Sequence, residues 1–304
     1  MIWSEAVDAS LFETALAQLG RTWVPLPDKP EETLELTARA LWFAAAGEPR
    51  SVGRCTTGSL PPLDEGAGRR LRELIEIRSR GTPLAHITGR QNFAGLEMLC
   101  GPEALIPRRE TELLAHTAIR IMRDALNTGH SAQAIDVCTG CGNVALALAQ
   151  SDPRVTVIGA DISSEALSLA GRNAVHLGLS TRVSFVASDL FDAIDAFRVH
   201  GQASVITCNP PYISSAKVSS MAAEVSDHEP RLAFDGGAFG LTVISKLLAD
   251  APRFLRKGGS LCFEVGVGNG RFVADRVRRN PAYAAVTEVC DEKGMLRVLV
   301  ATVA

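Results

Sequence analysis

The chain has 304 residues, of which 46% are hydrophobic and 21% are charged, and its formal net charge is −3. These values indicate a soluble globular protein with one large domain or two ordinary ones. Nonspecific nucleic-acid binding is not expected, because the chain has no excess of basic residues to neutralise phosphates. A local basic patch is still compatible with this net charge. The chain start lacks the features of a signal peptide, no apolar run is long enough to span a membrane, and the seven scattered cysteines suit reduced thiols. We therefore expect a cytoplasmic protein that has no contact with membranes.

Residues 1–80 are predicted to form a small helical domain. Glu32–Ala46 is rich in Leu and Ala and lacks internal Gly or Pro, and Arg69–Arg80 carries apolar residues at helical spacing. The segment between them, Gly47–Gly66, is rich in Gly, Pro, Ser and Thr and is predicted to be a loop. We assign this domain to substrate docking, with a purely structural role for its helix faces as the alternative.

Residues 81–108 are predicted to link this domain to the next one. Ile87–Phe93 and Leu96–Leu99 flank an Ala-Gly pair, which is typical of a β-hairpin. Pro107 disfavours a helix before it, and the acidic residues that follow suit the first turn of a helix over Glu110–Leu126.

Residues 109–304 alternate between strand and helix patterns, which indicates an α/β fold with a mostly parallel sheet covered on both faces. The predicted strands are Ala134–Cys138, Val155–Ala160, Val183–Ala187, Ala203–Cys208, Ser260–Val265, Ala284–Cys290 and Leu296–Val303. The predicted helices include Asn143–Gln150, Ser163–Leu177 and Leu241–Leu255. The connection between the last two strands is too short for a parallel crossover, so these strands should form an antiparallel hairpin.

A proline-rich loop follows the apolar strand Ala203–Cys208. Its sequence is Asn209-Pro210-Pro211-Tyr212, and the two prolines must end the strand and stiffen the loop. In open α/β sheets, ligands bind at this carboxyl edge. An isolated Asn-Pro would indicate only a turn, but the full motif after a buried strand indicates a site. We assign Asn209, Pro210 and Tyr212 as catalytic, and all four residues as substrate-binding.

A glycine-containing turn, Asp136–Asn143, ends one predicted strand and opens a helix. Gly140 and Gly142 would let the backbone approach a ligand closely. Asp161 ends the next strand, where a carboxylate can accept hydrogen bonds from both hydroxyls of a ribose. The alternative role for Asp161 is to cap the helix that begins near Ser163.

These strand ends together predict a nucleoside-binding site. Its expected residues are Asp136, Cys138, Thr139, Gly140, Cys141, Gly142, Asp161, Asp189, Leu190 and Asn209. The turn formally fits a dinucleotide fingerprint. However, a carboxylate at Asp136 suits a positively charged cofactor better than a pyrophosphate. S-adenosylmethionine carries a sulfonium and an amino group, so we favour it over NAD.

Cys138 and Cys141 form a Cys-x-x-Cys pair, which in other proteins is redox-active or half of a zinc site. No second pair with zinc spacing accompanies it, and the glycines with Asp161 already explain the turn. We therefore predict no metal.

The ordered motifs resemble those of the class I methyltransferases of the protein-glutamine N5 family, which include release-factor and ribosomal-protein glutamine methyltransferases. The resembling segments are Thr82–Gly89, Leu105–Arg108, the glycine turn, Asp161, Ser188-Asp189, Asn209–Tyr212, Glu229-Pro230 with Gly236-Gly237, and Glu264–Gly266. Ile106–Glu112 looks like the release-factor enzymes, and Cys138–Gly140 looks like the ribosomal-protein enzymes. The resemblance implies S-adenosylmethionine as cofactor and a Rossmann-like seven-stranded sheet with a C-terminal antiparallel hairpin.

An amide nitrogen is a poor nucleophile because its lone pair is delocalised into the carbonyl. The Asn209 side-chain oxygen and the Pro210 carbonyl could each accept one hydrogen bond from a substrate NH2 group. Such contacts would orient the lone pair and stabilise developing positive charge, and Tyr212 could pack against the flat amide.

The predicted activity is methyl transfer from S-adenosylmethionine to N5 of a glutamine in a release factor or ribosomal protein, by a monomer. Four alternatives stay open at this point. The acceptor could be a nitrogen of a small metabolite, or an amino group of a nucleic-acid base, which the net charge disfavours. A noncatalytic nucleotide-binding module would not need Asn209. A dehydrogenase would need a proton-transfer residue beside the glycine turn, and none is recognisable.

Overall fold

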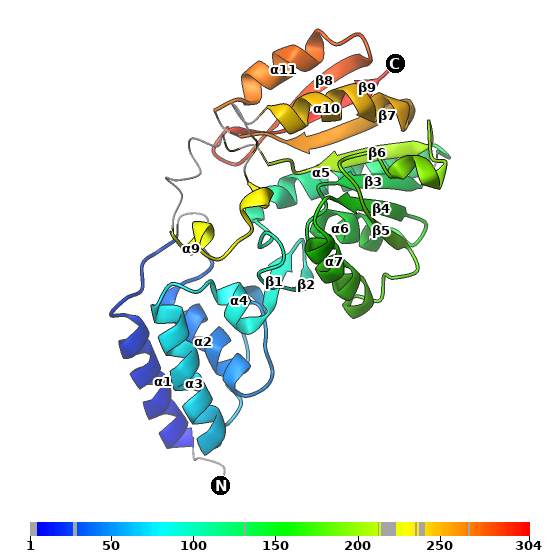
Figure 1. Cartoon of the computed structure of the whole chain (residues 1–304). Coiled ribbons are helices and arrows are strands. Elements are labelled where there is room, and N and C mark those ends of the chain that lie inside the picture. Colours follow the sequence, from blue (N-terminus) through cyan, green and yellow to red (C-terminus); the bar gives the residue numbers. More distant parts are fainter. Residues whose placement is uncertain are drawn as a thin grey trace. The chain divides into compact units, whose positions relative to one another are not determined.

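The computed structural model describes residues 5–26, 29–130, 132–211, 213, 223–234, 236, 241–266 and 268–304 (Figure 1). The chain divides into two compact units, each made from two stretches. The first comprises Met1–Pro102 with Ala222–Glu229, and the second comprises Glu103–Met221 with Pro230–Ala304. Within the described ranges, no helix is both long enough and apolar enough to cross a membrane.

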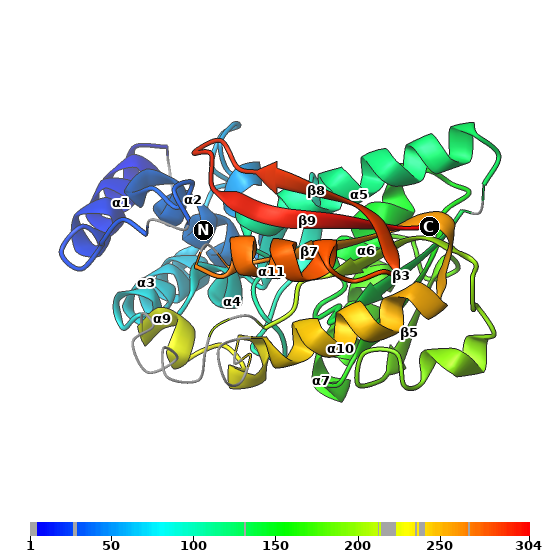
Figure 2. The same ribbon diagram turned by 90° about the horizontal axis from the view of Figure 1, so that it is seen from above.

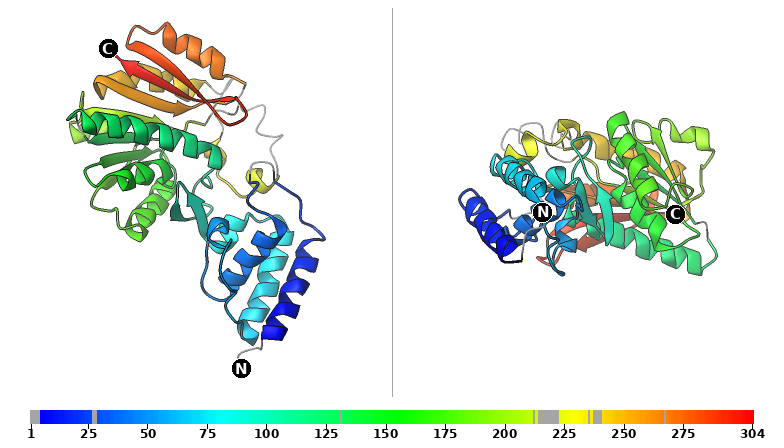
Figure 3. Two further views of the ribbon diagram at one scale, coloured as in Figure 1. Left: turned by 180° about the vertical axis from the view of Figure 1, so that it is seen from behind. Right: turned by 90° about the horizontal axis from the view of Figure 1, so that it is seen from below.

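The first unit is built mainly from helices. Its helices are α1 (Glu5–Leu19), α2 (Leu34–Ala45), η1 (Val52–Arg54), α3 (Glu65–Ser79), α4 (Leu84–Thr88) and α9 (Ala223–Ser226). Helices α1, α2 and α3 pack side by side (Figures 1 and 3). Side-chain caps fix where two of them begin, because Thr33 accepts a hydrogen bond from the Leu36 N–H and Asp64 accepts one from the Ala67 N–H. The core between them includes the fully buried residues Leu41, Trp42, Leu71 and Ile75.

The predicted hairpin is confirmed as strands β1 (Arg90–Phe93) and β2 (Leu96–Leu99), which pair antiparallel. Ala94 and Gly95 join them with φ values of 48° and 81°, the backbone that a tight two-residue hairpin turn needs. The first strand is shorter than predicted. Residues 87 and 88 belong to α4, and Gly89 ends that helix in the left-handed conformation with φ of 65°.

A buried cluster of charges joins α9 to the other helices of the first unit. Glu224 on α9 accepts hydrogen bonds from Lys29 at 2.7 Å and from Arg78 at 3.0 Å. Burial opposes its ionisation, but Lys29 and Arg78 outweigh burial and hold the pKa of Glu224 below its ordinary value. The same cluster contains Glu32, whose pKa burial raises to about 7. Glu224 therefore supplies the negative charge that lies closest to the two buried cations.

Replacing Glu224 with Ala is expected to lower the free energy of unfolding of the first unit by about 3 kcal/mol, because it leaves Lys29 and Arg78 buried without their closest counter-charge. The surface pair Arg70–Glu73 offers a control, since both side chains are more than half exposed. Glu73→Ala should change stability by less than about 0.5 kcal/mol. Thermal unfolding of both variants checks this, and equal effects would contradict it.

The second unit contains a seven-stranded sheet in the order β5-β4-β3-β6-β7-β9-β8. Its strands are β3 (Gln133–Val137), β4 (Thr156–Asp161), β5 (Val183–Ala187), β6 (Ala203–Cys208), β7 (Leu255–Glu264), β8 (Tyr283–Cys290) and β9 (Leu296–Val303). Strands β3 to β7 pair in parallel, whereas β9 pairs antiparallel with both β7 and β8. The predicted mostly parallel sheet with a C-terminal antiparallel hairpin is therefore confirmed.

Helices cover both faces of this sheet, as predicted. They are α5 (Arg109–Asn127), α6 (Asn143–Ser151), α7 (Ser164–His176), η2 (Ile194–Phe197), η3 (Arg231–Ala233), α10 (Thr242–Asp250), η5 (Ala251–Arg253) and α11 (Gly270–Arg278). Figure 2 shows α5 on one side of the sheet and α10 and α11 on the other. Two details differ from the prediction. Helix α11 was not predicted, and α10 ends at Asp250 because the chain tightens into η5 at Pro252, which has no N–H to continue an α-helix.

Strand β3 lies at the point where the strand order reverses. Strand β4 pairs on one side of it and β6 on the other, so that Asp136 is in register with Gly159 and with Thr207. Parallel strands present their carboxyl ends at one edge of the sheet, and open α/β sheets bind ligands at such a reversal. The fold thus brings the ends of β3, β4 and β6 together.

Candidate active site

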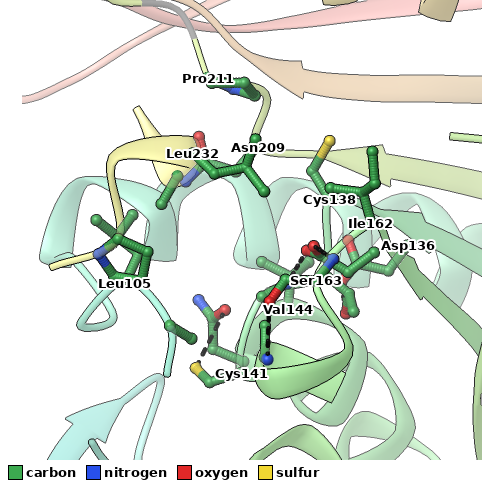
Figure 4. Close-up of a pocket in the computed structure, with 18 of the residues that line it drawn as sticks. Leu105, Asp136, Cys138, Cys141, Val144, Ile162, Ser163, Asn209, Pro211 and Leu232 are labelled. Atoms are coloured by element: carbon green, nitrogen blue, oxygen red, sulfur yellow. Dashed lines mark hydrogen bonds between the residues drawn. The ribbon is translucent and has the colours of Figure 1, made fainter. Parts of the chain in front are cut away.

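A cavity of about 310 Å³ lies in the second unit at this edge of the sheet. Ten of the predicted site residues line it: Asp136, Cys138, Thr139, Gly140, Cys141, Asp161, Asp189, Leu190, Asn209 and Pro211. Figure 4 shows Leu105 and Leu232 on one side of the cavity and Cys138 and Ile162 on the other. Gly142 and Pro210 do not line it, and Tyr212 falls outside the described residues.

Asp136 is the most deeply buried acid at the cavity, with 1% of its surface exposed. Its two carboxylate oxygens accept hydrogen bonds from the hydroxyls of Thr139 and Thr207, each at 2.6 Å. Burial raises the pKa of Asp136 to about 6, and the two hydroxyls oppose part of that rise. Among the described residues, no cationic side chain pairs with Asp136. The carboxylate is therefore solvated by neutral groups only.

Asp161, at the end of β4, is held by the backbone. Its Oδ2 accepts a hydrogen bond from the Gly140 N–H at 2.8 Å, and its Oδ1 accepts one from the Ser163 N–H at 2.9 Å. Burial raises the pKa of this carboxyl, against the effect of the N–H groups. Ser163, not Asp161, caps α7 through the Ala166 N–H. Because each carboxylate oxygen has two lone pairs, Asp161 keeps acceptor capacity toward the cavity.

The turn between β3 and α6 uses three residues with positive φ: Cys138 at 55°, Gly140 at 54° and Gly142 at 83°. No atom lies within 4 Å of the place where a Cβ on Gly140 would be, so its backbone faces open space. A Cβ on Gly142 would lie 3.0 Å from the Phe185 ring. Gly140 therefore leaves room at the cavity, whereas Gly142 allows close packing behind it.

Gly159 on β4 belongs to the same packing and was not predicted. A Cβ there would lie 2.6 Å from two atoms of the Phe185 ring and 3.1 Å from the Thr139 hydroxyl. Gly159→Ala should therefore lower the free energy of unfolding by about 1–3 kcal/mol. The matched change Gly171→Ala, in α7, meets open space and should raise stability by up to about 1 kcal/mol. Urea unfolding of both variants measures the difference, and a neutral Gly159→Ala would disprove it.

The turn after β5 places two further predicted residues. Leu190 is 4% exposed and has φ of 52°, a strained backbone for a bulky side chain. The Asp189 carboxylate is paired with Lys246 at 2.9 Å and is 58% exposed. Ser188 fixes the turn by accepting a hydrogen bond from the Ala193 N–H at 2.9 Å. Asp189 thus lines the cavity while its charge is used in an ion pair.

The loop after β6 positions Asn209. The Asn209 Nδ2 donates to the hydroxyl oxygen of Thr111, on α5, at 3.3 Å. The chain is held again beyond the prolines, where the Ile213 N–H donates to the Phe234 carbonyl and the Gly236 N–H donates to the Ile213 carbonyl. The short segment around η3 therefore closes the loop, and its residues Pro230, Leu232 and Ala233 line the cavity.

None of the seven cysteines, all of which lie in the described part of the chain, forms a disulfide. The Cys141 thiol is 2% exposed, and burial raises its pKa to about 12. A thiol with such a pKa is a poor nucleophile and a poor metal ligand at neutral pH. Cys138 contributes to the wall of the cavity as a partly buried apolar side chain. The pair is therefore explained by packing.

Several lining residues were missed at the sequence level, namely Leu105, Ile162, Leu232 and Val243. Ile162 and Leu232 are 59% and 55% exposed, so both leave apolar surface open at the cavity. For Ile162 a signal existed, since it directly follows Asp161. Leu232 lies in a segment that sequence patterns did not distinguish from a surface loop.

Known proteins resemble this chain over most of its length. A release factor glutamine methyltransferase from Agrobacterium fabrum is 34% identical over 238 residues, which cover 78% of this chain and 80% of the relative. One from Moorella thermoacetica is 34% identical and covers 86% and 87%. One from Chlorobaculum tepidum is 39% identical and covers 67% and 71%.

The chain belongs to the release factor glutamine methyltransferase family.

Two further comparisons concern the fold of this methyltransferase. The family model described as methyltransferase small domain matches residues 116–228. The crystal structure of the hMettl16 catalytic domain in complex with MAT2A 3'UTR hairpin 6 aligns with a TM-score of 0.53 and 16% identity. It covers 75% of this chain and 81% of that one, and at this identity it supports the fold only. The predicted resemblance and fold class are both confirmed, and the dehydrogenase alternative is not supported.

Proposed function

We propose that this methyltransferase transfers a methyl group from S-adenosylmethionine to N5 of a glutamine side chain in a peptide chain release factor. The observation that carries the proposal is Asn209 on its proline-stiffened loop, at a cavity whose lining includes the carboxylates of Asp136 and Asp161. The names of the relatives at 34–39% identity supply the acceptor class. None of these names refers to a ribosomal protein, a metabolite or a nucleic acid, so we do not retain those alternatives.

The cavity suits the proposed cofactor on the chemistry of its walls. Asp136 and Asp161 offer carboxylates without paired cations in the described chain, which suits an ammonium or sulfonium group and ribose hydroxyls. The open space at Gly140 admits a ligand against the backbone. Ile162 and Leu190 supply apolar surface for an adenine ring, and Arg108 lines the cavity as a counter-charge for a carboxylate. When bound, S-adenosylmethionine supplies an electrophilic methyl group.

The acceptor amide is activated by position and not by a strong base. The Asn209 Oδ1 accepts a hydrogen bond from one N–H of the substrate NH2 group, and the Pro210 carbonyl accepts a hydrogen bond from the other. The nitrogen lone pair then points toward the cavity, and the two oxygens stabilise the positive charge that develops on nitrogen. Pro211 and Tyr212 complete this substrate-binding loop in the proposal, with Tyr212 packing against the amide plane.

We further propose that the helical domain, residues 1–80, docks the release factor, with residues 81–108 as a linker and 109–304 as the catalytic domain. A protein substrate buries more surface than a single amide side chain, so a separate docking surface would supply affinity without altering the chemistry. The protein would act as a monomer in the cytoplasm.

The experiment that tests the function is methyl transfer from radiolabelled S-adenosylmethionine. Purified release factor, ribosomal subunits and a small-metabolite extract serve as parallel acceptors. Label on a glutamine of the release factor, located by mass spectrometry, is the expected result. Label confined to ribosomal protein or to the extract would overturn the proposed acceptor and keep the amide chemistry.

A further inference from the structure

A buried chain of hydrogen bonds lies directly behind Asn209. The Asn209 Nδ2 donates to the Thr111 hydroxyl oxygen at 3.3 Å, and the Thr111 hydroxyl donates to Glu264 Oε2 at 2.8 Å. Thr111 and Glu264 are each only 2% exposed. Thr111 lies in the first turn of α5 and Glu264 ends β7, so the chain ties three separate elements of the second unit together.

The donor and acceptor roles in this chain follow from the groups themselves. A carboxylate only accepts hydrogen bonds, so the single proton of the Thr111 hydroxyl is directed to Glu264. The hydroxyl oxygen can then only accept, and the group that faces it must be a donor. The amide of Asn209 has its NH2 group there. Its carbonyl oxygen consequently lies in the amide plane on the opposite side of the Cβ–Cγ bond, away from Thr111.

The opposite orientation of Asn209 is disfavoured by the same contacts. If the amide turned over, Oδ1 would face the Thr111 hydroxyl oxygen. The proton of that hydroxyl already points to Glu264 in a hydrogen bond. Two acceptors would then meet in a partly buried place without a proton between them, which costs more than a lost surface contact. Glu264 thereby sets, through Thr111, which atom of Asn209 is available to a ligand.

This orientation also decides which chemical group the site accepts. An exposed Oδ1 binds the NH2 group of an amide, whereas an exposed NH2 would bind an oxygen of a carboxylate. Glutamine and glutamate have almost the same shape and differ in this one donor. A site that needs a donor on its ligand rejects a ligand that offers only acceptors, because buried polar groups are left unpaired.

We propose that Thr111 and Glu264 are positioning residues that lock the Asn209 amide in the orientation required for transfer to glutamine and for discrimination against glutamate. The inference rests on the proposed function, since it presupposes an amide acceptor. Neither residue is required to touch the substrate, and both act through Asn209.

Three variants separate this role from simple packing. Thr111→Val keeps the shape of the side chain but has no hydroxyl, Thr111→Ser keeps the hydroxyl, and Thr117→Val makes the same change at another buried threonine of α5. Each is assayed for methylation of purified release factor, and for binding of S-adenosylmethionine by calorimetry. A release factor whose methylated glutamine is changed to glutamate serves as a competitive inhibitor.

Thr111→Val should lower kcat by about 100-fold, the loss typical when one preorganised polar contact is removed. Its dissociation constant for S-adenosylmethionine should stay within about threefold of wild type, because valine keeps the shape of the side chain where Thr111 lines the cavity and leaves Asp136 and Asp161 unchanged. Thr111→Ser and Thr117→Val should keep kcat within about threefold of wild type. In Thr111→Val the freed amide can turn toward a carboxylate, so the glutamate form should inhibit at least about tenfold more strongly than it inhibits wild type.

A fully active Thr111→Val beside an active wild type would overturn this inference and leave the proposed function intact. So would a Thr111→Ser as defective as Thr111→Val, or unchanged inhibition by the glutamate form. A wild-type protein that transfers no methyl group to release factor would overturn the proposed function and this inference with it.

Discussion

Asn209→Ala should lower kcat for methylation of release factor by about 10³-fold, while the dissociation constant for S-adenosylmethionine changes by less than about threefold. The reason is that the alanine side chain offers no acceptor for the substrate NH2 group, so the nitrogen lone pair is no longer directed at the methyl group. The contact with Thr111 at 3.3 Å is lost as well, but it lies on the side away from the proposed acceptor.

Single-turnover methylation and calorimetric binding of the cofactor separate the two quantities. Asn280→Ala is a suitable control, because the Asn280 side-chain oxygen accepts a local hydrogen bond from the Ala282 N–H, before β8 and outside the cavity. It should leave both quantities unchanged. If Asn209→Ala kept wild-type kcat, or if it lost cofactor binding and transfer in equal proportion, the role assigned to Asn209 would be wrong.

Asp136→Asn should weaken binding of S-adenosylmethionine by about 100-fold at neutral pH, because it removes a negative charge from a dry site that faces a cationic ligand. The change preserves the shape of the side chain and its contacts with Thr139 and Thr207, because one hydroxyl can rotate to accept from the new NH2 group while the other still donates to the amide oxygen. Wild-type affinity should also fall as the pH drops below about 6, where Asp136 takes up a proton, and Asp136→Asn should lack this dependence.

The effect of Asp136 on the free energy of unfolding of the ligand-free protein should be the reverse of its effect on cofactor affinity. Asp136 should stabilise the fold more at low pH than at high pH. The folded-state pKa of Asp136 is raised to about 6, so the folded protein holds this proton more tightly than the unfolded chain does. The resulting stability is present at low pH and is lost as the pH rises from about 4 to about 6, at about 1.4 kcal/mol per unit of pKa difference. Asp136→Asn should therefore unfold at a higher urea concentration than wild type at pH 8, with no advantage at pH 4. Equal midpoints at pH 8 would contradict a raised pKa.

Much of the catalytic sheet was predictable because its signals are local. The strands Val183–Ala187 and Ala203–Cys208 are confirmed at the predicted residues, since each is a short apolar run bounded by turn-forming residues. Strand β7 begins at Leu255, five residues before the predicted start, because Leu255 pairs with Ala203 before a register shift, and pairing resumes at Ser260.

The placement of the candidate site followed from topology, but its supporting contacts did not. Parallel strands bring their carboxyl ends to one edge, so the alternating strand and helix pattern was enough to group Asp136, Asp161 and Asn209. Thr111 and Glu264 lie 153 residues apart, and nothing near either residue indicates the other. Leu232 was missed because nothing in its local sequence distinguishes a residue that lines the cavity from one in a surface loop.

The first unit is made from two stretches of the chain, so it cannot be completed until the second stretch has been synthesised. Glu224 meets Lys29 across 195 residues of sequence and Arg78 across 146. When the ribosome reaches α9, it has already made β3, β4, β5 and β6. Domains generally fold in the order of synthesis, and contacts between distant residues form slowly. The N-terminal helices emerge first, yet they must hold two buried cations without the Glu224 carboxylate until much of the catalytic sheet has been translated.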